Sequence, residues 1–101
     1  MLIGIDIDGT LCDIQENFFD LTILENIEYY SKVNPKIDII EKVGLLSQRH
    51  TINIITARSS CFREVTEQWL STHGVCYDSL TMGMEYCDKY YGDNYYNVDD
   101  L

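Results

Sequence analysis

Two aspartates spaced two apart, Asp6 and Asp8, close the apolar segment near the N-terminus and are followed at once by a Gly-Thr pair. Carboxylates are rarely buried without a partner, so their place at the end of an apolar run points to chemistry rather than to packing. A carboxylate can attack a phosphorus atom and take the phosphoryl group. A glycine turn lets main-chain N–H groups approach phosphate oxygens. The stretch Asp6–Thr10 therefore indicates phosphoryl transfer.

Two other apolar runs also end in oxygen-bearing side chains. Thr56 ends the run TINIIT, and Asp99 and Asp100 follow the run YYNV. Parallel strands bring their carboxyl ends to one edge of a sheet, where ligands bind. Several carboxylates at one small site repel one another, and Mg²⁺ with its preference for oxygen ligands resolves this. The expected magnesium ligands are Asp6, Asp8, Asp99 and Asp100.

Four short segments rich in apolar and β-branched residues predict strands, and they cover residues 2–7, 51–56, 75–82 and 95–98. The first of them is apolar on both faces, which is typical of a strand buried in a parallel sheet. Segments with helical spacing lie between the strands. This alternation predicts right-handed crossovers and an α/β fold with a parallel sheet of about four strands. We expect a single domain over residues 1–101.

Apolar residues at helical spacing predict the helices. Residues 14–31 carry such a stripe, and Asn34-Pro35 is typical of an N-cap followed by proline at the first helical position. The apolar face of this next helix is expected to consist of Ile39, Ile40, Val43 and Leu46. A third helical face is marked by Phe62, Val65 and Trp69. Gly74 is a natural stop for that helix, and residues 84–91 predict a short fourth one.

Composition limits the class of protein. The chain has 101 residues, 46% of them apolar, which supports a packed core and speaks against disorder. A formal net charge of -10 argues against a general nucleic-acid-binding surface, so we expect no nucleic-acid partner. No segment approaches the ~20 apolar residues of a membrane span, and no signal peptide is visible. The four cysteines have no CxxC spacing and are expected to be free thiols in a cytoplasmic protein.

The motifs resemble those of the haloacid dehalogenase (HAD) superfamily of phosphohydrolases. DIDGT, residues 6–10, resembles the DxDGT signature of that family. Thr56 in IITAR looks like its second motif, and VDD, residues 98–100, looks like its fourth, acidic motif. The motifs occur in the family's order on the expected strands, over residues 2–100. The resemblance implies a three-layer Rossmann-like core with the DxD strand central, Mg²⁺ as cofactor and HAD-type phosphatase activity.

The resemblance also implies a role for each matching residue. Asp6 would be the nucleophile and a metal ligand. Asp8 would be the general acid and then the base that activates water, with its main-chain carbonyl facing the metal. Thr56 would hydrogen-bond the transferring phosphoryl group, while Asp99 and Asp100 would bind Mg²⁺ directly or through water. The residues expected to contact the substrate phosphate are Gly9, Thr10, Thr56, Ala57 and Arg58.

The sequence departs from the family at its third motif, a lysine or arginine that neutralises the nucleophile and the phosphate. By alignment this residue belongs near Gly83 or Met84, and neither can serve. Lys89 is the nearest candidate and is counted among the expected catalytic residues, while Arg58 is a second cation near the site. Loss of such a cation would weaken phosphate binding and slow the reaction by orders of magnitude, because preorganised charge is usually the largest catalytic contribution.

The spacing of the motifs leaves no room for a cap domain, so an open site is expected. Relatives usually continue past the acidic motif with another helix and strand, whereas this sequence stops at Leu101. A four-stranded sheet with an open edge is prone to associate. We therefore expect a homodimer or another cover for that edge.

The substrate is less well defined by the sequence. The stretch Thr56–Leu80 looks like one shared by deoxyribonucleotidase-like enzymes, by the phosphatase domains of polynucleotide kinase-phosphatases and by small phosphatases of capsule or sugar-phosphate pathways. Tyrosines crowd between residues 77 and 96, where they either offer a stacking face for a base or fill the surface of the domain; we favour the second. The acidic balance favours a small phosphorylated substrate, a nucleotide or a sugar phosphate.

The leading hypothesis is a Mg²⁺-dependent phosphomonoester phosphatase that forms an aspartyl-phosphate on Asp6. The alternative is a catalytically weak or inactive HAD-like module, or partner subunit, that binds phosphate or Mg²⁺ and lacks the third-motif lysine. The two differ in whether Lys89 or Arg58 reaches the Asp6 carboxylate. A receiver-type phosphoacceptor domain is disfavoured because it lacks DxDGT, and the absence of GxxxxGK[ST] disfavours a P-loop enzyme.

Overall fold

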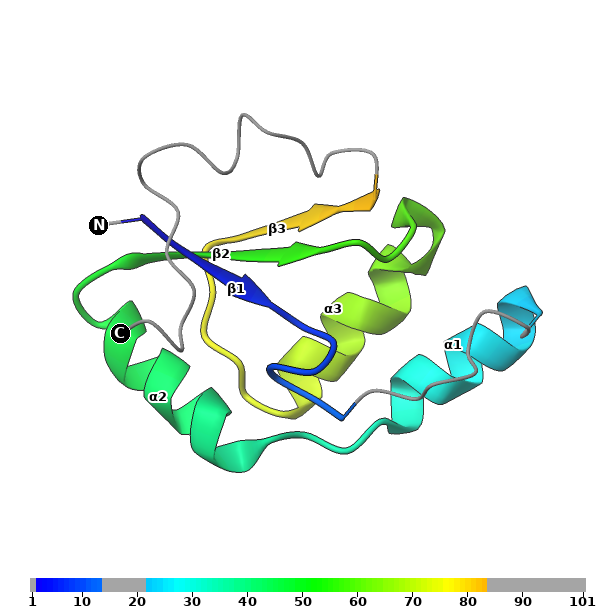
Figure 1. Ribbon diagram of the computed structural model, residues 1–101, viewed down its shortest axis with the longest axis horizontal. Coiled ribbons are helices and arrows are strands. Elements are labelled where there is room, and N and C mark those ends of the chain that lie inside the picture. The colour runs from blue at the N-terminus through cyan, green and yellow to red at the C-terminus, as the bar shows by residue number, and fades with distance from the viewer. Residues whose placement is uncertain (1, 14–21, 84–101) are drawn as a thin grey trace.

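The computed structural model describes residues 2–13 and 22–83 (Figure 1). Its elements follow in the order β1 (Leu2–Asp6), α1 (Ile23–Lys32), α2 (Ile37–Ser47), β2 (Thr51–Thr56), the 3-10 turn η2 (Ser60–Phe62), α3 (Arg63–Thr72) and β3 (Ser79–Met82). The expected alternation of strands and helices is confirmed for this part of the chain. The helix expected over 84–91 and the strand expected over 95–98 lie outside the described residues.

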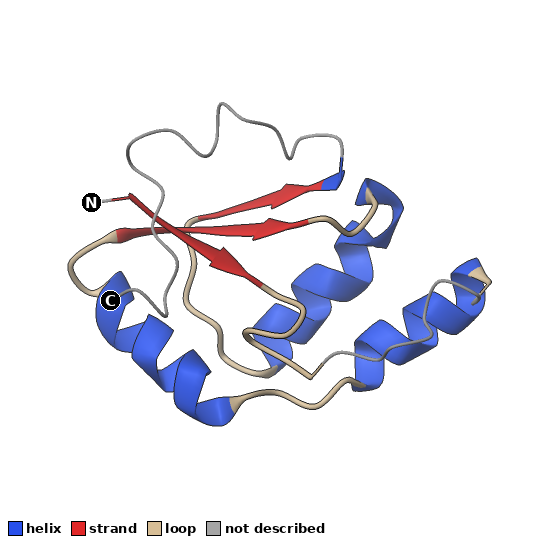
Figure 2. Ribbon diagram, in the orientation of Figure 1, coloured by secondary structure: helices blue, strands red, loops and turns tan. Residues whose placement is uncertain are grey.

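The three strands form one parallel sheet in the order β1-β2-β3. Ile3 pairs with Ile52, and Ile54 pairs with Leu80. Figure 2 shows the three long helices along the same side of this sheet, as right-handed crossovers in one direction require. The fold is thus a small α/β unit, compatible with a Rossmann-like architecture. Among the described residues β2 is the central strand and β1 lies at an edge, so the expected central place of the DxD strand depends on a fourth strand.

The core lies between the sheet and the helices. Alternate residues of the strands, such as Ile3, Ile5 and Ile54, are fully buried against this side of the sheet. The expected apolar faces of the helices are confirmed, since their residues are buried or pack against the core: Ile39, Ile40, Val43, Leu46, Phe62, Val65 and Trp69. The indole N–H of Trp69 donates to the carbonyl of Val33 at 2.9 Å, so its polar group is satisfied inside the core.

The start of α2 differs from expectation. Its N-cap residue is Lys36, with no capping hydrogen bond from the side chain, so the expected N-cap at Asn34 is wrong. Pro35 instead forms an antiparallel bridge with Cys12, which keeps the chain extended before the helix. The residue before a proline is itself biased toward extended conformations, which agrees with this arrangement.

The other helix ends follow local rules. The Thr22 hydroxyl accepts the N–H of Glu25 at 3.2 Å and caps α1, so the described half of the helix expected over 14–31 is confirmed from residue 23 onward. Gly74, with a φ of +69°, follows the end of α3, as expected for a helix stop. None of the helices in residues 2–13 and 22–83 is both long and apolar enough to cross a membrane.

Candidate functional site

The loop after β1 turns sharply at the edge of the sheet. The carbonyl of Ile7 accepts N–H groups from Thr10 at 3.1 Å, Leu11 at 2.8 Å and Cys12 at 3.3 Å, which closes a compact turn. Gly9 has a φ of +83°, a conformation that disfavours any residue with a Cβ. This requirement explains why glycine follows the two aspartates. Gly9 is exposed to solvent at the tip of the loop.

A second segment anchors this loop. The N–H of Asp13 donates to the carbonyl of Asn34 at 3.1 Å, and the N–H of Lys36 donates to the carbonyl of Leu11 at 2.8 Å. The ammonium of Lys36 also donates to the carbonyl of Gly9 at 3.1 Å. The loop is therefore held by the start of α2. Lys36 was not among the residues expected at this site, because Asn34-Pro35 is typical of a helix start, although the residue before a proline also favours an extended chain.

Asp6 ends β1 with its side chain open to solvent. One carboxylate oxygen accepts the N–H of Ile7 at 2.8 Å. Desolvation by the surrounding protein raises the pKa of Asp6; the charge of Asp8 adds to this, while the Ile7 hydrogen bond and the charge of Arg58 act in the opposite direction. The open surface shows that this desolvation is partial. A reachable, incompletely hydrated carboxylate is suited to attack an electrophile or to bind a hard cation.

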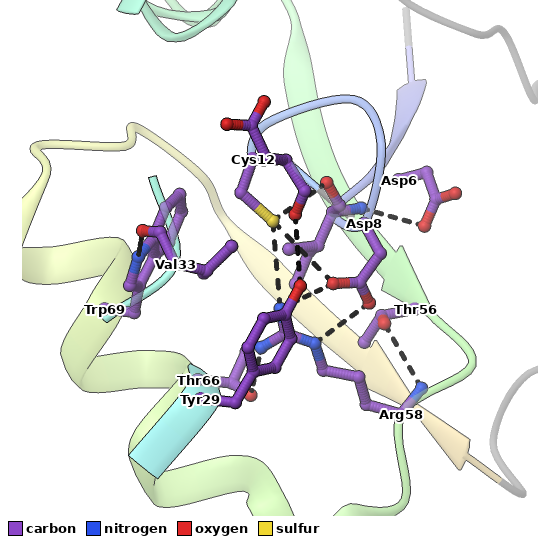
Figure 3. A network of polar contacts seen from close by, with 11 residues as sticks. Asp6, Asp8, Cys12, Tyr29, Val33, Thr56, Arg58, Thr66 and Trp69 are labelled. Atoms are coloured by element: carbon purple, nitrogen blue, oxygen red, sulfur yellow. Dashed lines mark hydrogen bonds and ion pairs between the residues drawn. The ribbon is translucent and has the colours of Figure 1, made fainter. Parts of the chain in front are cut away.

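Asp8 forms a two-point ion pair with Arg58 (Figure 3). The guanidinium donates from Nε to Oδ2 at 3.0 Å and from Nη2 to Oδ1 at 2.8 Å. The Arg58 side chain is only 2% exposed and that of Asp8 is 22% exposed. Such a fork fixes the plane of the carboxylate as well as its position. Figure 3 shows Asp6 lying apart from this pair.

The guanidinium of Arg58 is held on its remaining sides by three further residues. Nη1 donates to the hydroxyl of Thr66 at 3.1 Å, and the plane lies 3.8 Å from the ring centre of Tyr30. Nη2 also contacts the sulfur of Cys12 at 3.9 Å. In this structure the guanidinium of Arg58 is therefore paired with Asp8. The expected contact of Arg58 with a substrate phosphate stays a prediction. The polar Thr66 on the apolar face of α3 was the sequence signal for this contact.

Thr56 lies at the same edge of the sheet. Asp6 pairs with Ile55, so the last residue of β2 comes directly beside the end of β1. The Thr56 hydroxyl is buried and accepts the N–H of Arg58 at 3.2 Å, which leaves its own O–H to donate to a ligand. The structure thus brings together Asp6, Asp8, Thr56 and Arg58. The exposed Ala57 and Gly9 and the half-buried Thr10 lie in the adjoining loops.

The described residues fit one part of a magnesium site. Asp6 offers an open carboxylate, whereas the carboxylate of Asp8 is engaged by Arg58 and leaves its main-chain carbonyl as the available oxygen. Within residues 2–13 and 22–83, no group of three or more His, Cys, Asp or Glu side chains is placed to hold a metal. One carboxylate with further oxygens is still a common Mg²⁺ arrangement. Lys89, Asp99 and Asp100 lie outside the described residues.

Solved structures similar to this fold include two chains of Pnkp1/Rnl/Hen1 assemblies, whereas no family model and no curated protein matches the chain. A chain of a Pnkp1/Rnl/Hen1 complex aligns with a TM-score of 0.71 and 16% identity, over 95% of this chain and 36% of that one. A chain of the Pnkp1/Rnl/Hen1 RNA repair complex aligns with a TM-score of 0.65 and 21% identity, over 80% of this chain and 25% of that one. At these identities the likeness shows the fold, and the chain spans well under half the length of either match.

These neighbours contradict two expectations from the sequence. We expected a phosphatase for a small phosphate ester and no nucleic-acid partner, but one similar chain belongs to an assembly described as an RNA repair complex and the other to a complex of the same three components. The net charge of -10 led to the wrong expectation about nucleic acid, because it is a sum over the whole chain, whereas a site acts through its local field.

Proposed function

We propose that this chain is a HAD-type phosphohydrolase domain that removes a terminal phosphate from an RNA strand. The observation that carries the proposal is that one edge of the sheet holds an open Asp6 carboxylate and, two residues later, an Asp8 carboxylate held in a fixed orientation by Arg58. The DxDGT resemblance supports the reaction type. The likeness of the fold to chains of an RNA repair complex supports the substrate class.

The side chains have distinct tasks in this reaction. Asp6 attacks the terminal phosphorus, and the bond from phosphorus to the RNA oxygen breaks while Asp8 gives that oxygen a proton. A water molecule then attacks the same phosphorus, Asp8 takes its proton, and the bond to Asp6 breaks to release inorganic phosphate. Thr56 donates its hydroxyl to a phosphoryl oxygen. The fork from Arg58 fixes the plane of the Asp8 carboxylate, and each of its oxygens keeps a second lone pair through which it can exchange a proton.

Mg²⁺ belongs to this proposal as the cofactor. Asp6 and the main-chain carbonyl of Asp8 would hold it together with Asp99 and Asp100. When bound, the ion would neutralise charge on the carboxylate and on the phosphate oxygens. We also place the protein in the cytoplasm, a proposal supported by the free thiols of Cys12, Cys61 and Cys76.

The test measures inorganic phosphate released from a short RNA with a 3′-phosphate and from one with a 5′-phosphate, with and without Mg²⁺. An aryl phosphate serves as the small substrate. We expect Mg²⁺-dependent release from an RNA end, and a loss on the order of 10³-fold or more in Asp6→Asn, because the nucleophile is gone. Asp13→Asn is the matched control, since Asp13 is an exposed aspartate at the end of the same loop.

Two results would contradict the proposal. One is release of inorganic phosphate from the aryl phosphate with none from either RNA end, which would show that the site acts on small substrates. The other is full activity of Asp6→Asn on RNA, which would remove Asp6 from the reaction.

A further inference from the structure

A cavity of about 350 Å³ lies beside the proposed catalytic site, and no step of the proposed reaction uses it. Its walls come from α1, from the loop after β2 and from η2, and one end is formed by Asp8 and Arg58. This volume falls within the range of small-molecule binding sites. The cavity therefore adjoins the Asp8–Arg58 pair at the sheet edge.

Two aromatic rings line this cavity. Tyr30 and Phe62 contact each other edge to face, with ring centres 5.2 Å apart and planes at 68°. Tyr30 is 3% exposed and Arg58 lies over its ring. Phe62 is half-buried, so its ring is the aromatic surface that a ligand can reach. The contact with Tyr30 fixes the orientation of this ring in advance, which lowers the entropy lost on stacking.

The charges around the cavity favour an uncharged ligand group. Arg58 is the cation among the residues that line it, and Asp8 matches that charge at 2.8 Å. Among the described residues that line the cavity, a second phosphate of the strand would meet a carboxylate and no cation with spare charge. A planar, neutral group meets an aromatic ring instead. The hydroxyl of Ser59 adds a polar group that can bond the edge of such a ring system.

We propose that this cavity, the base pocket, holds the nucleobase of the nucleotide that carries the terminal phosphate, with the base stacked on Phe62. The inference rests on the proposed function, because a phosphate attacked by Asp6 is joined to its own base through a single ribose. The base must then lie close to Asp8, which is where the base pocket begins. Stacking accepts every base, so the pocket confers preference for a nucleotide end with little preference for sequence.

The first experiment measures stacking without turnover. A short RNA carries its terminal phosphate on a 2-aminopurine nucleotide, and a second RNA carries 2-aminopurine several nucleotides inside the strand. Both are titrated with the wild-type protein without added Mg²⁺. We expect quenching of the terminal probe only. Phe62→Leu should remove most of that quenching and weaken binding by about 5- to 100-fold.

Tyr77→Leu is the matched control. Tyr77 is also a half-buried aromatic residue packed against the core, but it does not line the base pocket. Both substitutions keep an apolar side chain, so both keep a contact with the core. Equal effects of the two variants on quenching would overturn the base pocket.

The second experiment compares kcat/KM for an RNA with a normal terminal nucleotide and for one whose terminal nucleotide is abasic. We expect the wild type to prefer the normal end by about 5- to 100-fold, and Phe62→Leu to lose that preference. Equal turnover of both RNAs by the wild type would overturn the base pocket and leave the proposed function standing. Terminal quenching that depends on Phe62, with no phosphate release from any RNA, would support the pocket and overturn the hydrolase.

Discussion

Asp8 and Arg58 share an ion pair whose two ends are buried to different extents. The guanidinium side chain is 2% exposed, whereas the carboxylate side chain is 22% exposed. Removal of one partner leaves the other charge behind, and the free-energy loss depends on whether water can reach that charge. Water can reach Asp8 but not Arg58, so the two single substitutions are not equivalent.

We expect Asp8→Asn to lower the free energy of unfolding by about 3–5 kcal/mol, because it leaves a buried guanidinium without its counter-charge. Arg58→Met should lower it by about 1–3 kcal/mol, because Asp8 can then turn to solvent. The double variant should be more stable than Asp8→Asn alone. Urea denaturation of the four proteins measures this cycle. Equal losses in the two single variants would contradict the role assigned to unequal burial.

The sequence could identify Asp6, Asp8 and Thr56 as site candidates, because the end of each apolar run is visible in one dimension. It could not reveal that the Arg58 guanidinium would form an ion pair with the Asp8 carboxylate. These residues are 50 positions apart and meet only because β1 and β2 are neighbours in the sheet. The same holds for Phe62, which the sequence places on an apolar helix face and which the fold also places at the wall of a cavity.

At the scale of elements, two glycines differ in the space that their surroundings leave for an added side chain. Gly83 follows β3 with a φ of +53°, and a Cβ there would come within 3.2 Å of the carbonyl oxygen of Arg58 and the amide nitrogen of Ser60. Gly44 lies inside α2, where an added Cβ would meet nothing within 4 Å. The same substitution is therefore expected to act with opposite sign at the two positions.

We expect Gly83→Ala to destabilise the protein by about 1–2 kcal/mol, since alanine is strained in this backbone conformation and crowds the loop that carries Arg58. Gly44→Ala should stabilise it by about 0.5–1 kcal/mol, because alanine restricts the unfolded chain and suits a helix interior. Thermal unfolding of both variants is the measurement. A stabilised Gly83→Ala would show that the turn after β3 tolerates a side chain.

The strands and helix faces were predictable because each leaves a periodic pattern in the sequence. The start of α2 was predicted wrongly, because the bridge from Pro35 to Cys12 joins distant segments and favours the extended chain over the local capping signal at Asn34. The number of strands stays a prediction, since the fourth expected strand, residues 95–98, lies outside the described residues.

At the scale of the whole molecule, the fold buries one of the three thiols that the structure describes and exposes the other two. Cys12 is buried, while Cys61 and Cys76 are exposed. Burial, together with the charge of Asp8, raises the pKa of Cys12 to about 12. The thiolate is the reactive form, so at mildly alkaline pH Cys12 carries roughly 10³-fold less of it than an ordinary thiol does.

Iodoacetamide should therefore label Cys61 and Cys76 in the native protein and leave Cys12 unmodified until urea unfolds the chain. Peptide mapping by mass spectrometry reads each cysteine separately. Rapid native labelling of Cys12 would show that the loop carrying Asp8 opens in solution, which would conflict with its anchoring by the segment before α2.

Asp8 and Asp6 differ in the contacts that they make within the fold, and this difference has an evolutionary consequence. Asp8 and Arg58 stabilise the fold together, so a lineage that abandoned catalysis would still keep both, and replacing one would first pass through a less stable intermediate. Asp6 is open to solvent, and its described contact is one hydrogen bond from the next residue. Other residues would replace Asp6 as soon as selection for the proposed activity ended. Under the proposed function, an intact Asp6 is thus the better marker of a working enzyme among descendants of this protein, while the Asp8–Arg58 pair marks only the ancestry of the fold.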